Sequence, residues 1–124
     1  MRLRLELLDG SFAVCRLGAA DPVPSWASGT FSSVTRTPDE LSIVCEAAAV
    51  PENVQAERGW RALRVAGPIA FETTGVAAAL VSPLAAASIS VFMIATFDTD
   101  YLLLQASRFD AALAILREAG HDVA

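Results

Sequence analysis

The stretch VFMIATFDTDYLLL, residues 91–104, decides how this chain folds. Ten of its fourteen residues are apolar or aromatic, and two acidic residues, Asp98 and Asp100, lie in its middle. Two apolar segments around a short polar one predict a strand, a turn and a second strand. Aspartate is favoured in turns because its side chain bonds the nearby backbone. Two interpretations therefore stay open: a plain turn, or a turn that also holds a ligand.

Helical patterns flank this predicted hairpin on both sides. The apolar positions at helical spacing are Val76, Ala79, Leu80 and Leu84 before it and Phe109, Ala112, Leu113 and Leu116 after it. The first helix is expected to start near Thr73 or Thr74, and Gly120 is a natural residue to end the second. With a strand at 60–67 and a very short one at the C-terminus, the second half has the order strand, helix, strand, strand, helix, strand.

The first half is rich in predicted strands and poor in helices. Leu3, Leu5 and Leu7 alternate with charged residues, which indicates a half-buried strand. Asp9-Gly10 predicts a hairpin turn that leads into the returning strand SFAVCRL.

A faint internal repeat links the two halves. Residues 33–44 align with residues 93–104 at an offset of 60, which places Glu40 opposite Asp100. A repeated hairpin predicts two related subdomains with their sheets side by side.

The composition excludes several classes of function. The net charge is −5 and all nine cationic residues are arginines, so the chain lacks the basic stripe of a nucleic-acid-binding protein. Cys15 and Cys45 fit no metal-ligand spacing and are interpreted as buried thiols of a cytoplasmic protein without a signal peptide. The uncharged stretch from Thr73 to Phe97 is long enough to span a bilayer, but its periodicity changes halfway. We therefore expect a helix and a strand there, and no membrane span.

Few residues offer catalytic or metal-binding chemistry. His121 is the only histidine and lies near the C-terminus, where chain ends fray, so it is expected to be solvated. Glycine-rich phosphate loops and clusters of metal ligands are absent, so neither a cofactor nor a metal is expected. An enzyme would have to use Asp98 and Asp100 as an acid–base pair, and we expect no catalytic residue.

Two segments have the chemistry to recognise a zwitterion. FETTGV, residues 71–76, opens a helix whose free N–H groups attract a carboxylate, and Gly75 allows close approach to the backbone. Asp100 lies beside the aromatic residues Phe97 and Tyr101 and is a good partner for an ammonium or guanidinium group.

Four segments resemble the ACT-domain family, in the branch that contains the CASTOR arginine sensors and small bacterial ACT proteins. They are TPDELSIV (37–44), GPIAFETTGV (67–76), PLAAASISVFMIATFDTDYLLL (83–104) and the spacing W-x-A-L-x-V-x-G (60–67). The resemblance implies an α+β, ferredoxin-like βαββαβ ACT domain in residues 60–124, preceded by a degenerate ACT-like, β-rich half in residues 1–59. It further implies a non-enzymatic regulatory protein, a homodimer that binds an amino acid at the dimer interface. Two alternatives stay open: an ACT-type interaction module without a ligand, and a small acid–base enzyme.

The resemblance also implies ligand contacts at particular positions. They are Ala70, Thr73, Thr74, Gly75 and Val76 before the first helix, Thr96, Phe97, Thr99 and Asp100 at the strand end and turn, and Ser90 and Val91 from a facing ACT unit. The chain departs from the arginine sensors at Thr73, where they carry an acidic residue, and Glu72 precedes it. The resemblance therefore does not imply arginine as the ligand.

Overall fold

The chain folds into two compact units. The structure, a computed structural model, describes all 124 residues. Its strands and α-helices are β1 (Arg4–Leu7), β2 (Phe12–Leu17), β3 (Ser33–Arg36), β4 (Leu41–Glu46), β5 (Ala56–Val65), α1 (Val76–Ala86), β6 (Val91–Ala95), β7 (Asp100–Gln105), α2 (Phe109–Glu118) and β8 (Asp122–Val123). Unit 1 contains Met1–Asp9 and Arg61–Ala124, and unit 2 contains Gly10–Trp60.

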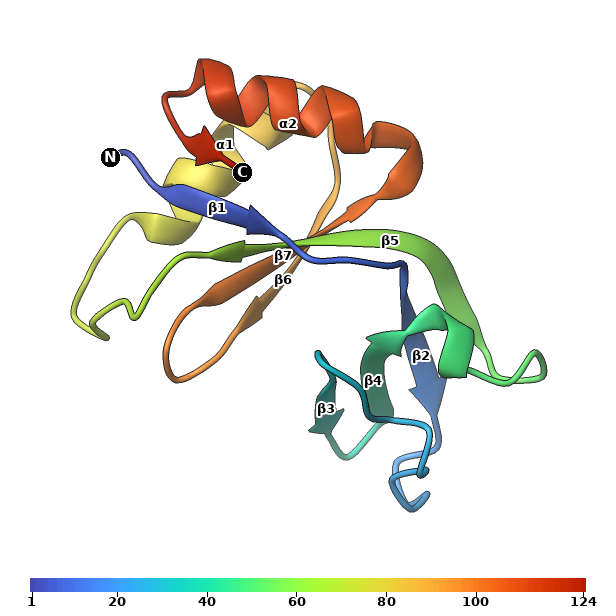
Figure 1. Cartoon of the computed structure of the whole chain (residues 1–124). Helices are drawn as coiled ribbons and strands as arrows, with labels where there is room; N and C mark the ends of the chain where they lie inside the picture. Colours follow the sequence, from blue (N-terminus) through green and yellow to red (C-terminus); the bar gives the residue numbers. More distant parts are fainter. The chain divides into compact units, whose positions relative to one another are not determined.

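Unit 1 has the ferredoxin-like architecture. After β1, its elements follow the order β5, α1, β6, β7, α2, β8, which is the βαββαβ pattern, and β1 is an additional strand between β5 and β8. The strands lie in the order β8, β1, β5, β7, β6, and both helices lie on one face of them (Figure 1). The predicted α+β fold class is confirmed.

One apolar cluster holds the sheet and both helices of unit 1 together. Val76, Leu80 and Leu84 of α1 are buried in it. The four predicted apolar positions of α2, which are Phe109, Ala112, Leu113 and Leu116, are also its buried positions. Burial of each large side chain contributes about 1.5–3 kcal/mol. The 3.6-residue pattern in the sequence thus identified the faces that form this core.

The first helix begins later than the sequence predicted. Gly75, and not Thr73 or Thr74, is its N-cap, with φ of 81°. This left-handed conformation favours glycine and cannot continue a helix, so α1 starts at Val76. The uncharged stretch 73–97 is divided between α1 and β6, and no helix is long and apolar enough to cross a membrane.

The hairpin predicted at Asp9-Gly10 is wrong. β1 pairs antiparallel with the end of β5 and parallel with β8, whereas β2 pairs with β4 and the beginning of β5. The two strands therefore run along successive parts of β5 and do not pair with each other. Gly10 has φ of 87°, which allows the bend that the dipeptide predicts, but the partner of each strand is chosen by long-range packing.

Unit 2 is small and rich in strands. It contains β2, β3, β4 and the first half of β5, and its one helical turn is a 3₁₀ helix, η1 (Ala47–Ala49). Cys15 and Cys45 are buried free thiols. Burial raises the pKa of both thiols, that of Cys45 to about 11. Both therefore stay protonated and unreactive at neutral pH.

His121 is buried, so the prediction of a solvated residue is wrong. Only 5% of its surface is exposed. Its Nδ1 accepts a hydrogen bond from the Leu3 N–H at 3.1 Å, and its Nε2 lies 3.1 Å from the Ala79 carbonyl oxygen. Since Nδ1 accepts, Nε2 carries the proton and donates it to Ala79. The ring therefore connects the N-terminal segment, α1 and the C-terminal segment, which the sequence position alone did not indicate.

We expect His121→Ala to lower the free energy of unfolding by about 2–3 kcal/mol, because the Leu3 N–H and the Ala79 carbonyl lose their partner. Urea unfolding followed by circular dichroism measures this change. Asp122→Ala is the control, since it removes an exposed ion pair with Arg2, and it should change stability by less than about 0.5 kcal/mol. Similar losses in the two variants would show that the histidine does not connect these segments.

Candidate functional site

Two segments of unit 1, one that follows β5 and one that follows β6, lie side by side in the structure. The first is the loop 66–75 between β5 and α1, and the second is the turn 96–99 between β6 and β7. The Ile69 N–H donates to the Asp98 carbonyl at 2.7 Å. A Cβ atom at Gly67 would lie 3.1 Å from the Thr99 Cβ and 3.3 Å from the Asp98 oxygen, so any larger residue would push the turn away by a few tenths of an ångström.

Threonines hold the turn in one conformation. Both the N–H and the hydroxyl of Thr96 donate to the Thr99 carbonyl at 2.9 Å. The Thr99 hydroxyl donates to the Val65 carbonyl at 2.6 Å, and this side chain is buried. Thr99, predicted as a ligand contact, thus has its hydroxyl committed to anchoring the turn on β5.

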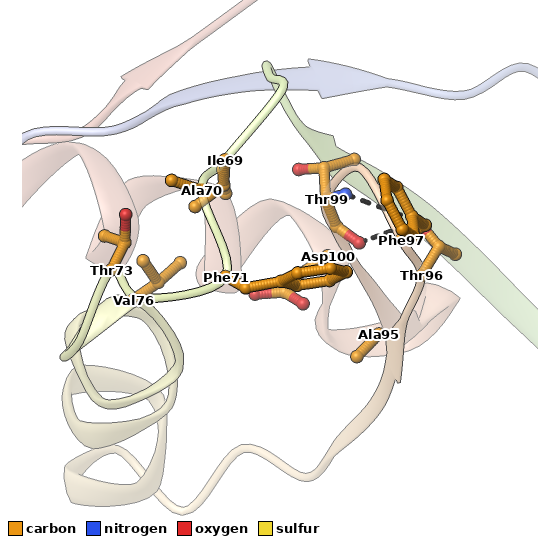
Figure 2. A pocket seen from close by; sticks show the side chains of 10 residues that line it. All are labelled: Ile69, Ala70, Phe71, Thr73, Val76, Ala95, Thr96, Phe97, Thr99 and Asp100. Carbon is orange, nitrogen blue, oxygen red and sulfur yellow. Dashed lines mark hydrogen bonds between the residues drawn. The ribbon is translucent and has the colours of Figure 1, made fainter.

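A pocket of about 260 Å³ lies between the loop and the turn. Figure 2 shows the loop and the start of α1 on one wall, with the turn and the adjoining strand ends on the other. The lining residues are Ile69, Ala70, Phe71, Thr73, Val76, Ala95, Thr96, Phe97, Thr99 and Asp100. This volume is close to the lower end of the roughly 300–1,000 Å³ that ligand pockets span, so the pocket suits a small molecule such as an amino acid.

Asp100 is the one charged residue in the pocket lining. It is the first residue of β7, pairs across the hairpin with Ala95 and is partly buried. No ion pair or hydrogen bond engages its carboxylate. Asp98, two residues earlier, is exposed and does not line the pocket. The first aspartate is therefore a turn residue, whereas the second presents an unpaired negative charge to the pocket.

The start of α1 offers a complementary positive end. Val76, its first residue, lines the pocket, and no side chain caps the helix at Gly75. The first N–H groups of a helix have no partner within it, and they carry the positive end of its dipole. The pocket thus contains a carboxylate and a helix N-terminus, the two groups that a zwitterion requires.

Two phenylalanines stand at the pocket with most of their surface in solvent. Phe71 of the loop is 72% exposed and Phe97 of the turn is 78% exposed. Their rings meet edge to face, with centroids 4.7 Å apart and an interplanar angle of 77°. Figure 2 shows Phe71 extending from its loop toward the turn that carries Phe97.

Seven of the eleven predicted ligand contacts line this one pocket: Ala70, Thr73, Val76, Thr96, Phe97, Thr99 and Asp100. Thr74 and Gly75 belong to the same loop but not to the lining. Ser90 and Val91 lie at the other end of β6, since Val91 pairs with Leu104 while Ala95 pairs with Asp100. Whether any of the eleven contacts a ligand stays a prediction.

The sequence missed three lining residues, Ile69, Phe71 and Ala95. Phe71 and Ile69 flank the predicted contact Ala70 in the segment PIAF. Extending the predicted contact to its neighbours in the loop would have included both. Ala95 enters through its pairing with Asp100, and this register is defined only once the hairpin forms.

Family comparisons agree with this architecture. A model of the ACT domain matches residues 55–118, more than half of the chain. The chain belongs to the ACT-domain family. A second model, of an N-terminal domain, matches residues 10–53.

Individual proteins resemble the chain in sequence or in fold. The chain is 30% identical over 107 residues to the human cytosolic arginine sensor for mTORC1 subunit 1, covering 80% of this chain and 32% of that protein. It is 39% identical to an Agobacterium tumefaciens protein of known structure, with a TM-score of 0.95, 100% of this chain and 93% of that chain covered. The ligand-free regulatory subunit of aspartate kinase from Thermus thermophilus shares the fold at 15% identity, with a TM-score of 0.63 and coverage of 93% and 96%.

We expect Thr99→Val to lower the free energy of unfolding by about 1–2 kcal/mol, because the Val65 carbonyl loses its hydroxyl donor at nearly constant side-chain volume. Chemical denaturation measures the loss. Thr73→Val makes the same chemical change at an exposed pocket residue and should alter stability by less than about 0.5 kcal/mol. A Thr99→Val protein as stable as the Thr73→Val protein would contradict the anchoring role.

Proposed function

We propose that this ACT protein is a non-enzymatic regulatory protein that binds an amino acid in the pocket between loop 66–75 and turn 96–99. The observation that carries the proposal is the unpaired carboxylate of Asp100 in the same pocket as the uncapped start of α1. The ammonium group of the ligand pairs with Asp100. Its carboxylate accepts hydrogen bonds from the N–H groups at the start of α1.

The pocket gives little support to an acid–base enzyme. Such an enzyme would need Asp98 and Asp100 on opposite sides of one substrate, but Asp98 is exposed and outside the lining. Amino-acid binding without chemistry needs only the one carboxylate. The human relative is a cytosolic arginine sensor, and this likeness supports a regulatory role and a cytoplasmic location.

We further propose that the protein is a homodimer whose second copy completes the site. β6 is an edge strand: it pairs with β7 on one side and its other edge is open. Its residues Val91–Ala95 are all hydrophobic, and such an edge is prone to pair with another strand. Antiparallel pairing of two β6 strands about Met93 would place Val91 of the second copy opposite Ala95. Ser90 of the second copy would then lie beside Thr96, at the pocket.

We also propose that residues 1–59 are a degenerate ACT-like half. The turn Thr37–Glu40 repeats the bonding of the turn Thr96–Thr99: the first threonine donates its N–H and its hydroxyl to the carbonyl three residues on. These turns correspond at an offset of 59, which corrects the offset of 60 in the sequence alignment. Asp100 then matches the buried Leu41, and Glu40 matches Thr99. Unit 2 has no α-helix, and Leu41 stands where unit 1 has Asp100. We therefore assign the second wall of the ligand site to a second copy of the chain.

Calorimetric titration with the twenty amino acids tests the binding proposal, and Asp100→Asn identifies the site. We expect Asp100→Asn to weaken binding by about 1.5–3 kcal/mol, the scale of a charge-assisted hydrogen bond, with folding unchanged. Asp98→Asn is the matched control, because it removes an aspartate of the same turn outside the pocket, and it should bind as the wild type does. Failure of all twenty amino acids to bind would refute the proposal.

A ligand that spans two copies must favour the dimer. We expect the amino acid found in the titration to strengthen dimerisation in sedimentation velocity over a dilution series. Ser90→Asp should weaken ligand binding although Ser90 lies at the far end of β6 from the pocket of its own chain, whereas Ser82→Asp on the exposed face of α1 should not. An unchanged monomer–dimer constant at saturating ligand would place the whole site within one chain.

A further inference from the structure

We propose that the pocket selects amino acids with an uncharged aliphatic or thioether side chain, such as leucine or methionine, and that Phe71 and Phe97 make this selection. The inference rests on the proposed function and deepens it. It is carried by two properties of the pocket: its charges and the exposed aromatic pair.

The charges of the pocket are balanced by a ligand with one ammonium and one carboxylate. Asp100 is the one charged residue of the lining, and it pairs with the ammonium group. A cationic side chain would need a second anion, but Glu72 does not line the pocket. An anionic side chain would lie near Asp100 without a cation to pair with, because no arginine lines the pocket. A charged side chain would thus be desolvated without compensation.

The aromatic pair gives the side chain an apolar partner. Apart from Asp100 and the threonines, the lining is hydrophobic, with Ile69 and Val76 beside the two phenylalanines. Phe71 and Phe97 are 72% and 78% exposed, so each ring keeps apolar surface available for contact. The two rings come from the two opposite segments of the pocket and touch each other at 4.7 Å between centroids. An aliphatic side chain placed against both rings removes their surface, and its own, from water.

Calorimetry with leucine, methionine, alanine and arginine tests this selection. We expect leucine and methionine to bind at least about tenfold more tightly than alanine, and arginine to bind more weakly than either. The double variant Phe71→Ala/Phe97→Ala should lose the preference for leucine over alanine, so that the ratio of the two affinities falls to about one. Both rings are largely exposed, so the melting temperature should stay unchanged. Val23→Ala, at an exposed apolar residue of unit 2, is the control and should keep the preference.

The outcomes separate this inference from the proposed function. Arginine binding more tightly than leucine and methionine would overturn the selection and leave the amino-acid site in place. An unchanged preference in the double variant would show that the phenylalanines do not select the side chain. Absence of binding by all four amino acids and by the rest of the twenty would overturn the site and the selection together.

Discussion

The pocket depends on the hydrogen bond from the Thr99 hydroxyl to the Val65 carbonyl, at 2.6 Å. Val65 ends β5, and the loop that forms one wall of the pocket starts directly after it. Thr99 ends the turn that forms the other wall. This bond, together with the bond from Ile69 to Asp98, fixes the two walls to each other. Asp100 and the start of α1 therefore belong to one cavity, and not to two independent loops.

The two halves of the chain contain turns with the same hydrogen bonds but with different residues after them. The turns at Thr37 and Thr96 have the same threonine-to-carbonyl bonds. In a tight turn the threonine hydroxyl can reach the carbonyl three residues further on, and this bond stabilises the turn. What differs is the residue that follows. In unit 2 it is Leu41, which is fully buried, and in unit 1 it is Asp100, which faces the pocket. The proposed ligand-binding role therefore rests on the residue after the turn, Asp100, and not on the turn itself.

The site carries a stability cost in the free protein. An unpaired carboxylate beside apolar groups and two phenylalanines exposed to water are both unfavourable in the free protein. The core of the same unit is apolar, and the buried faces of both helices and of the central strands belong to one cluster. The one buried histidine has partners on both ring nitrogens. Such a contrast is typical of a binding site, where a ligand supplies the missing partners.

The sequence by itself determined the order of elements in unit 1 and the apolar faces of both helices, because these follow from local periodicity. Residue chemistry also pointed to Asp100 and to the helix start, whereas Ala70 and Thr96 were expected only from the resemblance to the ACT family. Only the tertiary structure decided which strands pair, and it replaced the hairpin at Asp9-Gly10 with two strands along β5. It also decided that His121 is buried and that Asp98 and Asp100 have different surroundings. The physical reason is that strand partners and burial depend on groups far away in the chain, such as Leu3, Val65 and Ala79, and no local pattern records them.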